Sequence, residues 1–203
     1  MSAATPLLAL TMGDPAGVGP TIAVKALAGP GSPVACRVFV VGNPAVMERA
    51  RSRIGVTTPI HVMKSPEDLV PTAINVLPVG TLPDQPPIGR VDAACGRASF
   101  DYIITAIDLT LSHAVDGIVT NPINKEALRA AGLNYPGHTE ILAEKTGTHE
   151  YTMMFVLGGV AVVHVTTHCS LRKAIDLVDR ARVLANIRLL DGALRDMGHE
   201  HPR

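Results

Sequence analysis

Two histidines four residues apart, His164 and His168, stand in the stretch "HVTTH" and raise the question of a metal site. On a helix this spacing puts both rings on one face, where they can share a metal ion. The stretch is rich in β-branched residues and follows a Gly-Gly pair, which favours a strand. On a strand, residues four apart lie roughly 13 Å from each other, too far to share one zinc ion. We therefore expect His164 to be packed within a sheet and His168 to lie at the carboxyl end of the strand.

A glycine-rich turn, "TMGDPAGVGP", joins the first predicted strand to a helix and contains Asp14. Backbone N–H groups at the start of a helix favour a phosphate or a carboxylate, because they lie at the positive end of the helix dipole. The turn is neither GxGxxG nor a P-loop, since no lysine follows its last glycine. A tight turn without a ligand explains the same pattern, and Asp-Pro pairs commonly start turns. Asp14 nevertheless falls at the carboxyl end of a strand, where open α/β sheets bind their ligands.

Polar residues gather again in "TNPINKEALRAAGLNYPGHTE", which follows a later strand. Lys125 can pair with a phosphate as a point charge, and His138 can donate to the same group. Thr139 adds a hydroxyl or caps the next helix. The alternative is that Asn124 and Thr139 are helix N-caps, with Lys125 solvated and His138 an ordinary loop residue. Polar clusters on loops at a strand's end favour the functional interpretation.

Short β-branched runs alternate with helical patterns, which predicts an α/β fold with a mostly parallel sheet. The Gly158-Gly159 pair predicts a β-hairpin, and the amphipathic pattern from Asp176 to Gly198 predicts one final helix. The Pro-rich connector at residues 81–89 is a candidate hinge or surface loop. Strands are expected at residues 7–13, 37–42, 60–63, 74–80 and 116–122, and helices at residues 19–27, 44–55, 91–114, 124–132 and 139–147.

The composition argues against several classes of function. The 203 residues carry a formal net charge of zero without a basic block, so we expect neither nucleic acid nor an anionic membrane as a partner. No uncharged apolar stretch approaches the ~20 residues that a membrane helix needs. The three cysteines are widely spaced and form no CxxC, which predicts a reducing, cytoplasmic compartment; they are Cys36, Cys95 and Cys169.

The order of four motifs carries a family resemblance. "TMGDPAGVGP", "TNPINK", "PGHTE" and "TTH" follow one another between about residues 6 and 198. In this order they resemble the 4-hydroxythreonine-4-phosphate dehydrogenase family of vitamin B6 synthesis, which includes relatives acting on 4-phosphorylated threonate or erythronate. "GDPAGVGP" and "PGHTE" together make the resemblance specific.

The resemblance implies a three-layer α/β/α fold similar to isocitrate and isopropylmalate dehydrogenases, and a homodimer. It implies NAD-dependent oxidation and decarboxylation of a phosphorylated hydroxy acid, with a divalent metal such as Zn, Mg, Co or Mn. By motif, His138 and Thr139 are expected to bind the substrate, with Lys125 and Asp14 as further candidates. His168 of "TTH" is the expected metal ligand, whereas no residue is assigned to the nucleotide.

Two positions depart from the family pattern. Thr21 stands where members commonly carry glutamate, which removes a polar contact behind the first loop. Asn124 stands where some biosynthetic members have a histidine before the lysine. The second departure favours the relatives that act on threonate-type substrates.

The expected metal site is incomplete within these residues. A catalytic metal typically needs about three protein ligands, and the "NPH"-like and "HDQG"-like motifs that supply the others in the family do not occur here. We therefore expect an N-terminal, truncated portion of such an enzyme that is inactive alone. Residues 1–120 are predicted to form a first α/β domain. Residues 121–203 are predicted to form part of a second domain, with a β-hairpin and elements of a dimer interface.

Two other functions stay open at this point. One is a non-catalytic fragment that only binds anions or dimerises, which the missing metal ligands favour for the isolated chain. The other is a phosphate acyltransferase of similar architecture. The combination of "PGHTE" with "TTH" favours the dehydrogenase over the acyltransferase.

Overall fold

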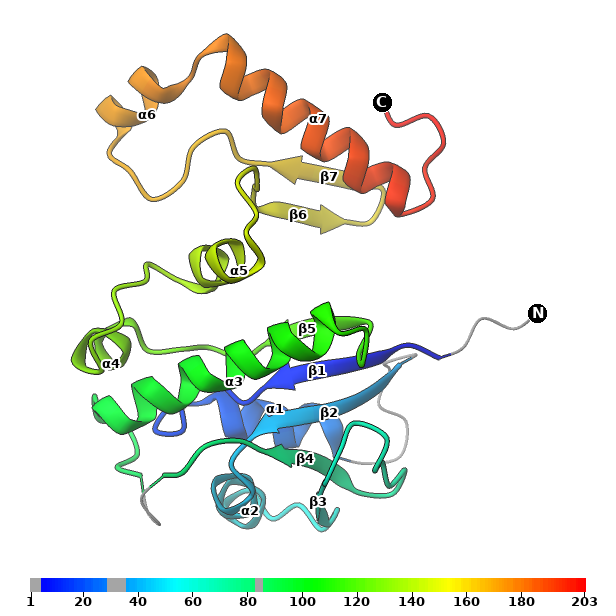
Figure 1. Cartoon of the computed structure of the whole chain (residues 1–203), viewed down its shortest axis with the longest axis vertical. Helices are drawn as coiled ribbons and strands as arrows, with labels where there is room; N and C mark the ends of the chain where they lie inside the picture. Colours follow the sequence, from blue (N-terminus) through cyan, green and yellow to red (C-terminus); the bar gives the residue numbers. More distant parts are fainter. Residues whose placement is uncertain (1–4, 29–35, 83–85) are drawn as a thin grey trace. The chain divides into compact units, whose positions relative to one another are not determined.

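The computed structural model describes residues 5–28, 36–82 and 86–203. They belong to two compact units, Met1–Lys145 and Thr146–Arg203 (Figure 1). The predicted boundary between a first domain (residues 1–120) and part of a second domain (residues 121–203) stays a prediction. Of the predicted Pro-rich connector at residues 81–89, residues 83–85 lie outside the described part of the chain.

A parallel sheet forms the middle of the first unit. Its strand order is β3-β4-β2-β1-β5, so β1 lies between β2 and β5. The run Phe39–Val41 of β2 is fully buried, as expected for a parallel strand that is covered on both faces. The strands are β1 (Leu7–Thr11), β2 (Arg37–Gly42), β3 (Ile60–Val62), β4 (Ile74–Pro78) and β5 (Gly117–Thr120).

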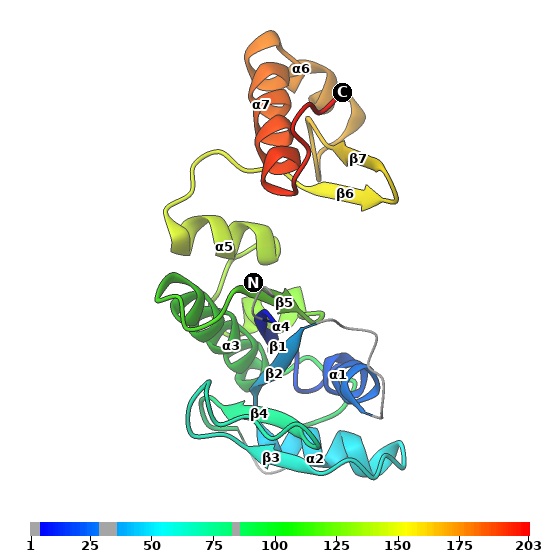
Figure 2. The ribbon, with the colours of Figure 1, turned by 90° about the vertical axis from the view of Figure 1, so that its right-hand side faces the viewer.

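Helices cover both faces of this sheet. Figure 2 shows α1 and α2 on one face and α3 on the other. Helix α3 contacts β1, β2 and β5, and it also packs against α4. The predicted three-layer α/β/α fold is therefore confirmed. The helices are α1 (Gly19–Leu27), α2 (Pro44–Arg53), α3 (Ala93–Leu111), α4 (Lys125–Ala130) and α5 (His138–Thr146).

Polar caps determine where three of these helices begin. The Asn43 side chain accepts from the Val46 backbone N–H at 3.0 Å, just before α2. The Asp92 carboxylate accepts from the Cys95 N–H at 2.9 Å at the start of α3, and Asn124 caps α4. Each bond satisfies a backbone N–H that has no partner within its own helix, which contributes about 1 kcal/mol.

The second unit consists of a hairpin and two helices. Strands β6 (Met154–Leu157) and β7 (Val160–Val163) pair antiparallel, and Gly158, with φ +57°, lies in the turn between them. This confirms the predicted hairpin. Helices α6 (Leu171–Leu177) and α7 (Arg180–Asp196) follow, and α7 contacts β7.

The prediction of one final helix from Asp176 to Gly198 was wrong at its start. Helix α6 ends at Leu177 and the backbone is extended at Val178. The Asp179 carboxylate then accepts from the Arg182 N–H at 2.8 Å and begins a new helix. An aspartate side chain competes with the backbone for such N–H groups, so it favours an N-cap over a helix interior.

In the described part of the chain, no helix combines the length and the apolar character that crossing a bilayer requires.

Candidate functional site

Two loops meet at the carboxyl edge of the sheet. The first loop (residues 12–18) follows β1 and the second loop (residues 121–124) follows β5, and these strands are neighbours. The Asn121 N–H donates to the Thr11 carbonyl at 3.3 Å, and the Asp14 N–H donates to the Pro122 carbonyl at 3.0 Å. Asp14 and the later polar cluster therefore lie at the same edge of the sheet.

Glycines let the first loop approach its neighbours closely. Gly13 has φ +76°, and a Cβ atom there would lie 2.5 Å from the Pro122 carbonyl oxygen. At Gly19, the first residue of α1, a Cβ would lie 2.3 Å from the Met12 carbonyl oxygen. Both distances are shorter than real Cβ contacts, so no other residue fits without moving the backbone. The glycine pattern thus reflects the packing of the loop as well as its conformation.

Asp14 is the buried acid of the site. Its side chain is almost fully covered, with 4% of the residue exposed, and one carboxylate oxygen accepts from the Ala16 N–H at 2.9 Å. Burial raises the pKa of Asp14, and the nearby Asp92 raises it further, whereas hydrogen bonds from Ala16 and Asn124 lower it. Asp14 is therefore a carboxyl group that holds a proton more readily than an exposed aspartate does.

Asn124 connects Asp14 to helix α4. Its side-chain oxygen accepts from the backbone N–H groups of Glu126 at 2.9 Å and Ala127 at 3.2 Å. The same side chain lies near the Asp14 carboxylate and lowers its pKa. The interpretation of Asn124 as an N-cap is confirmed, and the same side chain has a second role that the sequence did not indicate.

His138 begins helix α5 and reaches back to the second loop. Burial lowers the pKa of its ring, and the nearby Asn121 backbone partly offsets this effect. The Nε2 atom is buried and has no hydrogen-bond partner among the described residues. The Asn121 side-chain nitrogen and the Thr11 hydroxyl share this property. Buried polar atoms are nearly always paired, so a group of unpaired ones beside two loops is typical of a ligand-binding site.

The acid sensitivity of His138 gives a first test. Its pKa in the folded protein lies below the ordinary value of 6.5, so protonation favours the unfolded chain. The contribution of His138 to stability is present above pH 6.5 and is lost as the pH falls through the pKa that His138 has in the folded protein. Urea titrations at falling pH should therefore show a smaller loss of unfolding free energy in His138→Gln than in the wild type. The exposed His149 provides the control, and a curve for His149→Gln that matched His138→Gln would contradict the assignment.

The other predicted residues of the first unit occupy more open positions. Lys125 is exposed at the first position of α4, and Thr139 is half-buried at the second position of α5. Because α5 begins at His138, the interpretation of Thr139 as an N-cap was wrong. Its hydroxyl lies in the first helical turn, beside His138.

The histidine pair of "HVTTH" lies in the second unit and outside any strand. Strand β7 ends at Val163, so His164 is exposed, with its ring edge-on to Phe155 at 5.2 Å between centroids. The expectations that His164 is packed within the sheet and that His168 ends the strand were wrong. The chain leaves the hairpin early, where the Arg182 Nε donates to the Val165 carbonyl at 2.6 Å.

His168 itself has an unusual backbone. It is exposed on the loop before α6, and its φ of +54° lies in the left-handed region, which costs a non-glycine residue about 1 kcal/mol or more. Its role as a metal ligand stays a prediction. The described residues contain no group of three or more His, Cys, Asp and Glu side chains that could hold a metal ion.

Comparison with known proteins identifies the family. The model of the family described as "Pyridoxal phosphate biosynthetic protein PdxA" matches residues 34–203. The chain belongs to the PdxA family. A 4-hydroxythreonine-4-phosphate dehydrogenase from Beijerinckia indica is 43% identical over 198 residues, which cover 97% of this chain and 58% of that protein. A D-threonate 4-phosphate dehydrogenase from Cupriavidus necator is 38% identical over 205 residues, covering 100% and 62%.

Solved structures of PdxA-family proteins agree with this assignment. The crystal structure of 4-hydroxythreonine-4-phosphate dehydrogenase from Klebsiella pneumoniae gives a TM-score of 0.90 at 37% identity, and the match covers 100% of this chain and 62% of that one. The predicted family and fold are therefore confirmed, and the relatives are named as dehydrogenases. The chain spans about 60% of the length of these relatives.

Two residues near Asp14 were missed in the sequence analysis. Asp92 caps α3 and its charge acts on Asp14. Cys95 follows in the same helix turn, and burial raises its pKa to about 12, so it is an inert thiol. The pattern "VDAAC" marks a helix N-terminus. It does not show that this N-terminus lies beside the first loop.

Proposed function

We propose that the chain supplies the substrate-binding edge of an NAD-dependent dehydrogenase that acts on a 4-phosphorylated hydroxy acid. The observation that carries the proposal is the cluster of Asp14, Asn124 and His138 at the carboxyl edge of the sheet. Because the chain belongs to the PdxA family, we propose for this cluster the chemistry of PdxA-type enzymes. The cluster combines a buried acid, an amide and an imidazole with a free nitrogen, which suits a polar substrate with several hydroxyl groups.

Each residue has a distinct proposed role. His138 contacts the phosphorylated substrate through its Nε2 atom, and the Thr139 hydroxyl adds a second contact. Asp14 and Lys125 contact other polar groups of the same molecule, Asp14 from the buried side and Lys125 from the solvent side. Holding the substrate in one orientation removes part of the entropic barrier to reaction.

The proposed reaction oxidises the carbinol next to the carbon that bears the carboxylate, with hydride passing to NAD, and then releases CO₂. A divalent metal would polarise the carbinol oxygen, and His168 is the proposed contributor to its site. The described residues do not make such a site by themselves. We further propose the cytoplasm as the compartment and a homodimer as the assembly.

The residue at position 124 supports a choice between the two classes of substrate. A histidine at this position would bring a second ring to the site, whereas Asn124 caps α4 and lowers the pKa of Asp14. We therefore propose a 4-phosphothreonate-type or 4-phosphoerythronate-type acid rather than 4-phosphohydroxy-L-threonine. The Cupriavidus necator relative is named for the first of these acids.

Calorimetric titration of this chain tests the proposal without needing turnover. 4-Phospho-D-threonate should bind more tightly than 4-phosphohydroxy-L-threonine. His138→Ala should weaken its binding about tenfold, the value of one charge-assisted hydrogen bond. His149→Ala changes an exposed histidine outside the cluster and should leave the affinity unchanged.

An assay of NADH formation with the same acids and a divalent metal tests the reaction itself. Formation of NADH by this chain would contradict the expectation that it is inactive alone. Binding of acyl phosphates in preference to both hydroxy acids would instead favour the acyltransferase alternative. Equal losses of affinity in His138→Ala and His149→Ala would remove His138 from the site.

A further inference from the structure

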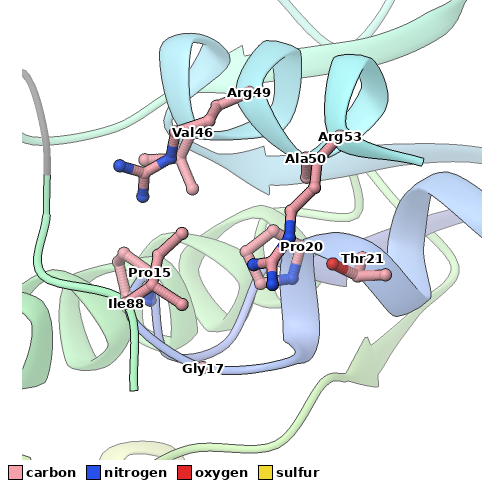
Figure 3. A pocket seen from close by; sticks show the side chains of 9 residues that line it. All are labelled: Pro15, Gly17, Pro20, Thr21, Val46, Arg49, Ala50, Arg53 and Ile88. Carbon is pink, nitrogen blue, oxygen red and sulfur yellow. The ribbon is translucent and has the colours of Figure 1, made fainter. Parts of the chain in front are cut away.

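A groove lies on the other side of the first loop, between this loop and helix α2. Figure 3 shows Arg49 and Arg53 extending from α2 toward the first loop and the start of α1. Gly17 and Thr21 belong to the opposite wall. Of the proposed substrate residues that the structure describes, Asn124 and His138 do not line this groove. The Asp14 carboxylate lies behind the Gly17 wall, because a Cβ atom on Gly17 would meet its Oδ2 at 3.5 Å.

The two arginines bring uncompensated positive charge to this groove. Arg49 donates from Nη1 to the Pro86 carbonyl at 3.2 Å, a neutral acceptor. Within residues 5–28, 36–82 and 86–203, no carboxylate forms an ion pair with Arg49 or Arg53. Arg51, on the same helix, does have such a partner, since its Nε lies 2.9 Å from the Glu48 carboxylate. Two guanidinium groups one helical turn apart repel each other unless an anion lies between them.

The opposite wall also offers hydrogen-bond donors, which favour an anion as the arginines do. Helix α1 spans nine residues and has no side-chain cap at its N-terminus, where Val18 is the cap residue. Pro20 has no N–H group, and the Gly17 N–H already donates to the Asp14 carbonyl at 2.9 Å. Thr21 is therefore the groove residue of α1 that offers a backbone N–H, near the positive end of the helix dipole. The Thr21 hydroxyl also lines the groove. A carboxylate at this position would compete for the arginines, whereas a threonine leaves them available.

We propose that this groove binds a phosphate group. A phosphate has several oxygens that can accept at the same time from a guanidinium fork and from backbone N–H groups. Arg49 and Arg53 supply the forks from α2, and Thr21 supplies its hydroxyl and its backbone N–H from α1. The ligand is inorganic phosphate or a phosphate group of a larger molecule. The proposal does not depend on the proposed dehydrogenase function.

Amide NMR titration with inorganic phosphate at constant ionic strength tests the site. Phosphate should shift the Gly17 and Gly19 resonances. The double variant Arg49→Gln/Arg53→Gln should weaken this binding about tenfold or more. The control Lys25→Gln/Arg129→Gln removes the same charge from exposed positions outside the groove and should leave the affinity unchanged. Circular dichroism of each variant checks that it is folded.

Two results would overturn the proposal. One is the absence of a phosphate-dependent shift at Gly17 and Gly19 in the wild type. The other is an equal loss of affinity in both double variants, which would show a general effect of net charge. His138→Ala should leave these shifts intact, so failure of the proposed dehydrogenase function would be distinguishable from failure of the phosphate site.

Parallel titrations identify the source of the phosphate group. NAD, 4-phospho-D-threonate and inorganic phosphate are each compared between the wild type and Arg49→Gln/Arg53→Gln. If the arginine variant weakens NAD binding, the groove takes the pyrophosphate of the dinucleotide. If it weakens 4-phospho-D-threonate binding, the groove takes the phosphomonoester. If only inorganic phosphate is affected, the groove takes the free ion.

Discussion

Replacing Gly96 by alanine is expected to destabilise the first unit by about 3 kcal/mol. Gly96 lies within α3 where α4 crosses it, and a Cβ atom there would lie 2.0 Å from the Ala127 carbonyl oxygen. Backbone atoms cannot rotate out of the way, so α4 must move away from α3. That movement also pulls Asn124, the cap of α4, away from Asp14. The substitution should therefore reduce both stability and substrate affinity.

The same substitution elsewhere provides a control with the opposite sign. Gly192 lies within α7, and a Cβ atom added there meets nothing within 4 Å. Gly192→Ala should therefore stabilise its helix by about 1 kcal/mol through helix propensity alone. Denaturant unfolding followed by circular dichroism measures both variants, and hydrogen exchange at Ala127 and Leu128 reports on α4. A Gly96→Ala protein with wild-type stability would show that α3 and α4 are not in close contact.

Gly13→Ala is expected to be nearly as severe, at about 3 kcal/mol. Two costs add at this position. The left-handed φ of +76° disfavours any residue with a Cβ atom, and that atom would also press on the Pro122 carbonyl. The carbonyl is the acceptor for the Asp14 N–H, so the two loops must separate. Loss of 4-phospho-D-threonate binding should accompany the loss of stability.

Gly55→Ala separates the two costs. Gly55 has a similar φ of +68°, but a Cβ atom there would lie in open space. Its replacement should therefore cost only the conformational part, about 1 kcal/mol. Thermal unfolding of the two variants gives the steric part as the difference between them. Equal melting temperatures for Gly13→Ala and Gly55→Ala would show that the loops do not press on each other.

The local elements could be predicted closely because local signals define them. Helix α1 and strand β2 have the predicted bounds, since Pro20 suits a first helical turn and "RVFVVG" is a short apolar run. The break at Val178 was missed, because apolar residues continue at helical spacing across it from Ile175 to Val183. At this position the N-cap formed by Asp179 starts a new helix, although the helical spacing of apolar residues continues. His164 was misplaced for a related reason, since β propensity continues beyond the last residue that pairs with β6.

The site could be predicted in part because parallel strands end at one edge. That rule alone places Asp14 and the residues after β5 together. It does not place Asp92, which acts on Asp14 from a helix distant in sequence. It also does not show that Asn124 both caps α4 and lowers the pKa of Asp14. Nor does it show that Arg49 and Arg53 lie over the first loop. These relations depend on how helices pack across the sheet, which no local pattern records.

The strand order has a consequence for how the protein is made. Strand β1 leaves the ribosome first, but its neighbour β5 follows only after β2, β3, β4 and α3. The hydrogen bond from the Leu7 N–H to the Asp116 carboxylate joins positions 109 residues apart. Such distant pairings form late, because the intervening chain must first become ordered. A nascent chain stalled before Asp116 would therefore carry the glycine-rich loop without its partner, and the proposed substrate binding would be the last property that the first unit acquires.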